Sequence, residues 1–192
     1  MATLLVGGTT VFDGSATQGL TSATTFPAGH ILQVTTGEIS GGATHSSIND
    51  WVTIHSHTIT PLSSTSDIMI WFSGGIGPGG SAAVPFGARV IRGSTEVGVS
   101  TAKAGTSLKG NTTMTENLAF SSDDRSHAFS GHFMDTTRSN GTSAITYNMQ
   151  VSPRQDGTGT ATFRVGSIYG SSTSGFVINT LQVITTMEIE AS

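Results

Sequence analysis

The chain has no cysteine, little charge and no long apolar segment. The lack of cysteine excludes disulfides and thiolate metal sites. Charged residues make up 10% and the net charge is −4, with no basic stripe of the kind that binds nucleic acid. No segment approaches the roughly 20 apolar residues of a membrane span, and the N-terminus lacks the basic start of a signal peptide. The sequence therefore predicts a cytosolically made protein with no nucleic-acid partner and no membrane insertion.

What the chain does contain favours strands. Glycine accounts for 25 of 192 residues, and Ser and Thr together make up roughly 30%, well above ordinary usage. Such enrichment is also typical of disordered linkers. However, 35% of the residues are hydrophobic, and many of them stand in β-branched runs that suit a pleated sheet. A sandwich with Thr-rich outer faces accounts for this composition best.

Apolar and polar residues alternate with period two along most of the chain, and helical periodicity is almost absent. The expected strands are His30–Thr36, Trp51–Ile59, Asp67–Ser73, Ala88–Arg92, Glu96–Ser100, Ser126–Met134, Ala144–Val151, Thr160–Ser167 and Leu181–Glu190. Glycine-rich turn signals separate nearly all of them, including the cluster Gly74–Gly80. Short strands at regular spacing without helices indicate an all-β, jelly-roll-like antiparallel sandwich over residues 28–192.

One expected strand is apolar on both sides. Ile68, Ile70 and Phe72 fall on one face, and Met69 and Trp71 fall on the other. A strand of this kind is central in its sheet or packs against a partner chain. In a protein with so few charges, the second apolar face predicts self-association, and we expect a homotrimer.

Residues 1–27 form a different segment, rich in Gly, Thr and Ser. Alone it cannot bury enough apolar surface to stay folded. It packs either as an edge strand of its own sandwich or against another subunit, and we interpret it as an extended arm for docking. A Gly- and Thr-rich strand can add to an exposed sheet edge through main-chain hydrogen bonds. The candidate partner-binding residues are the arm's apolar ones and its first residue: Met1, Leu4, Leu5, Val6, Val11 and Phe12.

No catalytic constellation is visible, so we expect a protein that is not an enzyme and needs no cofactor. There is no cysteine nucleophile and no G-x-S-x-G motif. Asp123 and Asp124 lie in a run typical of a solvated loop. Gly74–Gly80 lacks the Lys-Ser/Thr of a phosphate-binding loop and is interpreted as a plain loop. The aromatic residues Trp51, Trp71 and Phe72 are expected in the core rather than in a sugar-stacking platform.

Six segments, taken in order, resemble a β-sandwich domain of tail-fibre and head-fibre proteins of tailed bacteriophages, especially marine and freshwater ones. They are His30–Thr36, Thr58–Gly75, Ala88–Gly98, Phe133–Val151, Thr160–Ser174 and Leu181–Ser192. The resemblance implies a virion structural protein on the outer surface of the particle, assembled in the host cytoplasm. The first expectation is a capsid decoration (cement) or head-fibre protein docked on the major capsid protein, or another virion protein, through its arm. The alternative is a tail-fibre tip or adhesin that binds the host surface, for example a glycan.

His55 and His57 stand two residues apart on an expected strand and therefore point to the same face. Cupin jelly rolls follow such a pair with a glutamate, which is missing here. In trimeric phage fibres and spikes, the same pair from three chains coordinates a metal on the three-fold axis. The other interpretation is a pair of surface histidines hydrogen-bonded to Thr and Ser neighbours. We favour the surface pair and expect no bound metal, with His55 and His57 as the weak metal candidates.

Overall fold

The protein is described by a computed structural model. The described residues are 4–6, 9–12, 28–40, 43–47, 50–78, 86–98, 112–114, 127–138, 141–153, 161–169, 177–179 and 181–191. Within these ranges the regular structure consists of strands, with no helix, and so none long and apolar enough to span a membrane. The prediction of an all-β protein is confirmed.

The first half of the chain contributes strands β1 (Leu4–Val6), β2 (Thr9–Phe12), β3 (Ile31–Ile39), β4 (Ala43–Ser47), β5 (Val52–Ile59), β6 (Asp67–Pro78), β7 (Phe86–Arg92) and β8 (Thr95–Glu96). The second half contributes β9 (Thr112–Met114), β10 (His127–Asp135), β11 (Ile145–Pro153), β12 (Ala161–Val165), β13 (Ser167–Tyr169), β14 (Val177–Asn179) and β15 (Gln182–Ile189). A turn at Gly93, where φ is +58°, joins β7 to β8, which begins one residue before the expected strand Glu96–Ser100.

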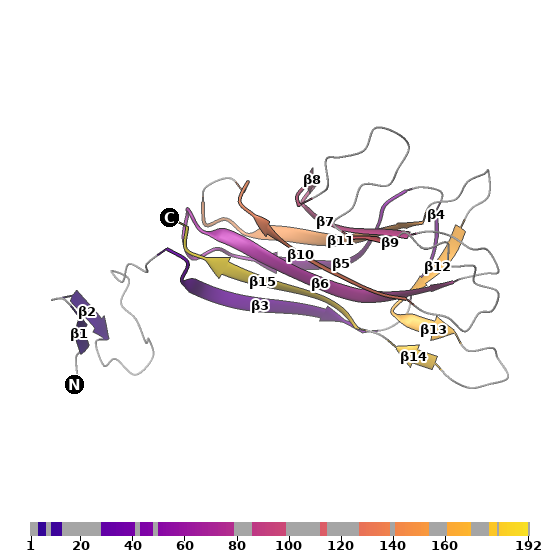
Figure 1. Cartoon of the computed structure of the whole chain (residues 1–192), viewed down its shortest axis with the longest axis horizontal. Helices are drawn as coiled ribbons and strands as arrows, with labels where there is room; N and C mark the ends of the chain where they lie inside the picture. The colour runs from indigo at the N-terminus through magenta and orange to yellow at the C-terminus, as the bar shows by residue number, and fades with distance from the viewer. Residues whose placement is uncertain are drawn as a thin grey trace.

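Two antiparallel sheets pack face to face (Figure 1). One contains the strand order β3-β15-β6-β10, and the other contains β5-β11-β7-β9. Among these eight strands the chain changes sheet at every step except β7 to β9, and the last strand, β15, lies between β3 and β6. This is the strand order of a jelly roll, which confirms the predicted architecture. Strands β12 and β4 extend the first sheet along the second half of β6.

Strand β6 is the central strand of its sheet, as the two apolar faces of Asp67–Ser73 predicted. It is 12 residues long and pairs with β10 on one side and with β15 and then β12 on the other. The predicted loop Gly74–Gly80 is therefore wrong for its first half, because β6 continues to Pro78. A Cβ on Gly74 would lie 2.0 Å from Oε1 of Gln182 and 2.6 Å from Cζ of Phe129. This glycine thus allows close packing inside a strand.

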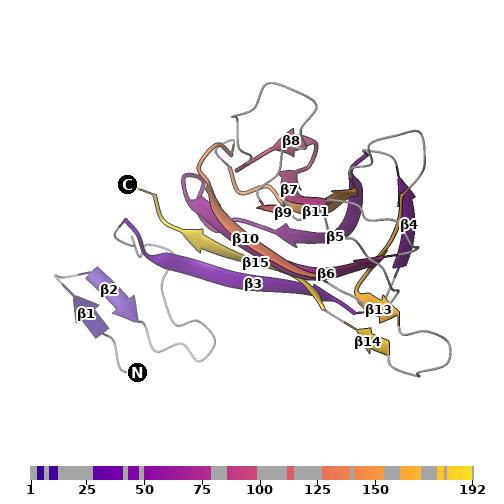
Figure 2. The same ribbon diagram turned by 45° about the vertical axis from the view of Figure 1, so that its right-hand side comes forward.

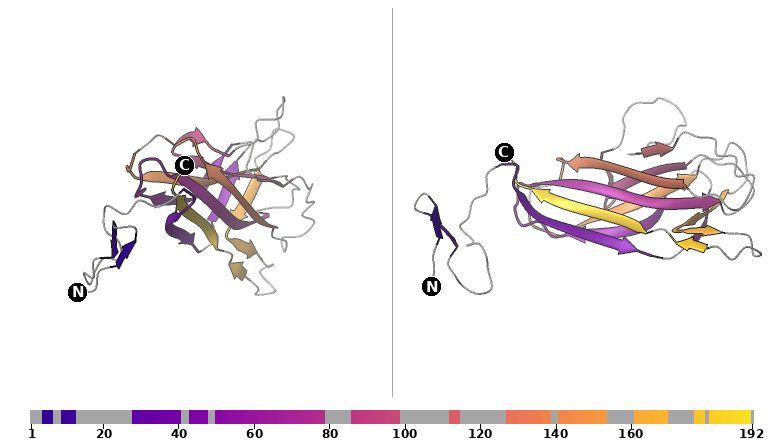
Figure 3. Two further views of the ribbon diagram at one scale, coloured as in Figure 1. Left: turned by 60° about the vertical axis from the view of Figure 1, so that its left-hand side comes forward. Right: turned by 60° about the horizontal axis from the view of Figure 1, so that its bottom comes forward.

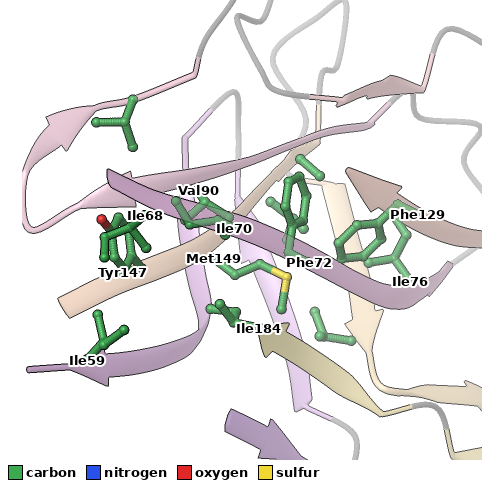
Figure 4. Close-up of a cluster of buried hydrophobic side chains, with 14 of the residues drawn as sticks. Ile59, Ile68, Ile70, Phe72, Ile76, Val90, Phe129, Tyr147, Met149 and Ile184 are labelled. Carbon is green, nitrogen blue, oxygen red and sulfur yellow. The ribbon is translucent and has the colours of Figure 1, made fainter. Parts of the chain in front are cut away.

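The hydrophobic core fills the space between the two sheets (Figure 4). Ile68, Ile70 and Phe72 of β6 face Tyr147 and Met149 of β11, all of them buried. Each such aliphatic or aromatic side chain contributes about 1.5–3 kcal/mol when fully buried. Strands β5, β7, β10, β12 and β15 also contribute to the core, among others with Ile59, Val90, Phe129, Phe163 and Ile184.

Strand β15 alternates as predicted, but its more apolar face points away from the core. Its inward residues are Gln182, Ile184, Thr186 and Glu188, and its outward, half-buried ones are Val183, Thr185, Met187 and Ile189. The strand therefore buries three polar side chains, Gln182, Thr186 and Glu188. It leaves apolar side chains on the outer surface.

The two ends of the sandwich meet at one pole. The backbone N–H of Gly29 donates to the carbonyl of Glu190 and that of Glu190 donates to the carbonyl of His30, each at 2.8 Å. Strands β1 and β2 pair with each other, Leu5 opposite Thr10, and belong to neither sheet (Figure 2). The described part of the predicted arm is thus a two-stranded ribbon.

Candidate functional site

The outer face of the β3-β15-β6-β10 sheet carries side chains in register across four strands. The right-hand view in Figure 3 shows β15, in yellow, between violet β3 and magenta β6. Pairing places four apolar side chains in one line across the sheet: Val34, Met187, Met69 and Met134. We call this line the methionine row. Its end members Val34 and Met134 are 52% and 39% exposed.

Farther from the chain ends, the same face becomes polar and is hollowed around Trp71. A groove of about 550 Å³ lies there, and we call it the Trp71 groove. It is lined by Trp71, Phe72, Ser73, Ser130, Gly131, His132, Val183 and Thr185. The register sets Trp71 of β6 between Thr185 of β15 and His132 of β10. An indole is thus flanked on both neighbouring strands by groups that form hydrogen bonds.

The lining of the Trp71 groove suits binding better than catalysis. It contains hydroxyls, one imidazole and one indole that is 38% exposed. It contains no carboxylate, ammonium or guanidinium group, so it has no acid–base pair and no partner for a charged ligand. The sequence identified Trp71 as facing away from Ile70 but assigned it to a core or partner contact. It did not identify Ser73, Ser130, His132 or Thr185.

The prediction of a core position is wrong for Trp71, which is exposed, and is confirmed for Phe72. Trp51 is only partly buried. Phe72 is 2% exposed, whereas Trp51 is half-buried at the start of β5. The guanidinium carbon of Arg89 lies 4.2 Å from the centre of the Trp51 ring. Arg89 in turn donates to Glu96 at 2.5 Å and to Gln150 at 2.9 Å. Trp51 therefore has a cation–π partner already and does not offer a free platform.

His55 and His57 share a face, but that face points into the sandwich. The register of β5 against β11 shifts between the pairs Met149–His55 and Gln150–Thr53. A bulge at Ile54 therefore turns the strand, and Thr53 and Trp51 do not lie on the histidine face. A Cβ on Gly37 of β3 would lie 2.5 Å from Nδ1 of His57 and 3.1 Å from Nε2 of His55. The histidines are half-buried against β3, so the prediction of surface histidines is wrong.

Hydrogen bonding at this pair involves threonines, as predicted. Nε2 of His57 lies 2.9 Å from Oγ1 of Thr35, which lies 2.8 Å from Oγ1 of the buried Thr186. Burial, and then the nearby His55, lower the pKa of His57 below 6.5. In the described ranges no three His, Asp or Glu side chains gather as metal ligands. The expectation that no metal is bound, as opposed to one shared by three chains, stays a prediction.

We expect the stability of the protein to fall as the pH drops from 7.5 to 5.5. Because the folded state lowers the pKa of His57, the unfolded chain binds protons more readily near pH 6.5. The stabilisation by the neutral imidazole is complete above that pH and is lost below it. Urea unfolding at several pH values measures the loss. His57→Gln should flatten the dependence, whereas His132→Gln on the outer face should keep it. Equal slopes in wild type and His57→Gln would contradict the assignment.

A buried carboxylate holds the loop between β5 and β6. Glu188 accepts hydrogen bonds from the backbone N–H of Leu62 and of Ser63, each at 2.9 Å, and from the Ser66 hydroxyl at 2.6 Å. Nε2 of Gln33 donates at 2.6 Å. Burial alone would raise the pKa of Glu188, but these hydrogen bonds outweigh it and the pKa is lowered. The buried Arg138 donates to the Ser66 hydroxyl at 2.8 Å, so one hydroxyl bridges opposite charges.

A second buried carboxylate, Asp135, joins the two sheets. Arg92 of β7 donates to both of its oxygens at 2.7–2.8 Å, and the hydroxyl of Tyr147 on β11 donates at 2.8 Å. Burial and the nearby Asp135 raise the pKa of Tyr147, so its hydroxyl stays protonated. The hydrogen bonds of both carboxylates therefore connect parts of the fold to one another. We therefore assign Asp135 and Glu188 to the fold and place the candidate site at the Trp71 groove.

The predicted arm residues are only partly described. Leu4, Leu5 and Val6 lie in β1, Val11 and Phe12 lie in β2, and Met1 lies outside the described residues, as do Asp123 and Asp124. Their role in partner binding stays a prediction.

No protein-family model and no curated protein matches this chain. Among solved structures, it is similar to a chain of the structure of infectious bursal disease virus Gx strain. The identity is 12% and the TM-score is 0.40, over 95% of this chain and 47% of that chain. The protein thus spans about half the length of the chain it matches, and a likeness this weak carries no functional argument.

Proposed function

We propose that the protein is a structural component of a bacteriophage virion, a capsid decoration or head-fibre protein docked by its N-terminal arm. The observation that carries this proposal is the β1–β2 ribbon, which pairs with neither sheet of the sandwich. A two-stranded ribbon has unpaired outer edges, and such edges add to the sheet of another protein through main-chain hydrogen bonds. Jelly rolls recur in viral capsid proteins, although the fold alone does not fix a function.

The methionine row supports self-association, and we propose a homotrimer. Met69, Met134, Met187 and Val34 occupy the half of the outer face that is nearer the pole where Gly29 meets Glu190. Methionine is enriched in protein interfaces, and this row has no charge to oppose contact between identical copies. Three copies can then meet near the arm on the virion surface, with the Trp71 grooves farther out.

A tail-fibre tip or adhesin is the second candidate function. The observation that favours it is the Trp71 groove, since a protein that recognises a host receptor needs a binding surface. The two functions differ in what the arm contacts. A decoration protein uses it on the capsid shell, whereas a tail tip uses it on the fibre.

We expect deletion of residues 1–27 to abolish binding to capsids that lack the protein. The core strands all lie beyond this segment, so the shortened chain should keep its cooperative unfolding and the mass of three chains by light scattering. Binding is measured by co-sedimentation with the stripped capsids. Thr10→Pro is a milder variant, because it places a residue without an N–H within the ribbon. It should weaken the same binding to stripped capsids.

Saturation of the stripped capsids by the shortened protein would show that the arm is not the anchor. If the full-length protein binds host cells but never capsids, the tail-tip function replaces the decoration function.

A further inference from the structure

The two tryptophans of the protein differ in availability. Trp51 is covered by Arg89 on the outer side of the β5-β11-β7 sheet. Trp71 stands on the opposite sheet, is 38% exposed and borders a groove. An indole that is exposed beside hydroxyl groups offers a ligand a flat apolar ring and hydrogen-bonding groups side by side. Of the two tryptophans, Trp71 is therefore the one that is available to a ligand.

The surroundings of Trp71 are divided along the strand. Toward the chain ends its same-face neighbour is Met69, and on the other side it is Ser73. Ser73 pairs across the sheet with Ser130 of β10 and with Val183 of β15. The groove thus combines one flat apolar ring with a polar rim made mostly of hydroxyls.

We infer that the Trp71 groove binds a neutral saccharide. One face of a pyranose ring is a patch of C–H groups, which packs on an indole, while its edge carries hydroxyls that both donate and accept hydrogen bonds. Ser73, Thr185 and His132 supply matching groups on three adjacent strands. The volume of about 550 Å³ lies within the range of small-molecule sites.

The charge of the groove narrows the ligand class. Its lining has no Lys or Arg to pair with a carboxylate, sulfate or phosphate and no Asp or Glu to pair with an amine. Acidic sugars and nucleotides therefore lack a counter-charge here, and the chain's net charge of −4 disfavours polyanions further. Neutral hexoses and N-acetylhexosamines remain as the matching chemistry. The inference does not rest on the decoration role, since none of the described lining residues belongs to the arm, but it deepens the tail-tip candidate, which rests on the same groove.

Fluorescence of the full-length protein tests this inference. In Trp51→Phe the remaining tryptophan signal comes from Trp71 alone. Methyl glucoside, methyl galactoside, N-acetylglucosamine and their short oligomers are titrated into this variant. We expect a saturable change with at least one of these neutral sugars and none with sialic acid. In a calorimetric titration of the otherwise native chain, Trp71→Ala should weaken binding about tenfold, in line with the energy of one aromatic contact.

Matched variants separate the groove from the fold. Ser73→Ala and His132→Ala should weaken the same sugar with unchanged thermal unfolding, whereas Trp51→Ala on the other sheet should leave the affinity unchanged. The inference is overturned if no neutral sugar binds, or if Trp71→Ala binds as tightly as wild type. It is also overturned if Trp71→Ala reduces the assembled mass in light scattering and no sugar binds, because the face is then a contact between copies.

Discussion

Replacement of Glu188 by glutamine should lower the free energy of unfolding by about 3 kcal/mol, because hydrogen bonds to a charged group contribute about 1.5–3 kcal/mol each and a buried donor left unsatisfied is costly. Glu188 is fully buried, and its oxygens accept from two backbone N–H groups, a hydroxyl and an amide. A glutamine keeps only one acceptor oxygen and turns an NH₂ group toward donors. It also removes the negative charge that balances Arg138 across the Ser66 hydroxyl.

Urea unfolding at pH 7.5 measures this loss, and Glu190→Gln is the matched control two residues along the chain. Glu190 is half-buried and accepts two long hydrogen bonds of 3.3 and 3.4 Å, so its substitution should cost less than about 0.5 kcal/mol. Because the folded state lowers the pKa of Glu188 from 4.5, its stabilisation is complete above that pH and declines as the carboxylate is protonated. Glu188→Gln should remove that acid sensitivity. Equal stability of the two variants would refute this account.

Replacement of Asp135 by asparagine should cost about 3 kcal/mol, because hydrogen bonds to a charged group contribute about 1.5–3 kcal/mol each. The carboxylate of Asp135, on β10, is 1% exposed and ties that strand to Arg92 of β7 and Tyr147 of the neighbouring β11 in the other sheet. Asparagine retains one oxygen and cannot accept from both partners as the carboxylate does. The remaining guanidinium then has no charge partner, although Arg92 is partly exposed to water.

A double-mutant cycle with Tyr147→Phe isolates the hydroxyl's part of this effect. Tyr147→Phe alone should cost about 1 kcal/mol, and less in the Asp135→Asn background, where the hydroxyl has already lost its acceptor. Thermal and urea unfolding of the four proteins measure the coupling. Strictly additive losses would mean that the hydroxyl and the carboxylate stabilise the fold independently.

Alternation with period two identified most of the sandwich strands, because each has one side on the core. The same pattern stopped short at Gly74, since glycine normally signals a turn. Strand β6 continues through Gly74 because it stays paired with β10 there, and the glycine leaves room for the side chains of Gln182 and Phe129. It also failed at Ile54, where a bulge places two consecutive residues on the inner side. Local sequence does not reveal a bulge whose position depends on the partner strand β11.

The candidate site was only partly predictable. The sequence places Trp71 and Met69 opposite Ile70, since that follows from one strand alone. Which side chains flank Trp71 depends on pairing among β6, β10 and β15, whose residues lie about 50–115 positions apart along the chain. Ser130 and Thr185 carry no signal of their own among so many hydroxyls. The histidines were found by spacing, but their inward direction required the position of Gly37 on β3.

Because β15 is the last strand in the chain but lies inside its sheet, this sheet is completed only at the end of protein synthesis. Among the described strands, β3 pairs within its sheet only with β15, and β15 fills the gap between β3 and β6. At synthesis rates of about 5–20 residues per second, roughly 7–29 seconds pass between the completion of β3 and the start of β15. During that interval the nascent chain exposes strands that can pair with a neighbouring copy on the same messenger. The final strand thus completes the sheet, and the nascent chain depends most on chaperones before that strand has been synthesised.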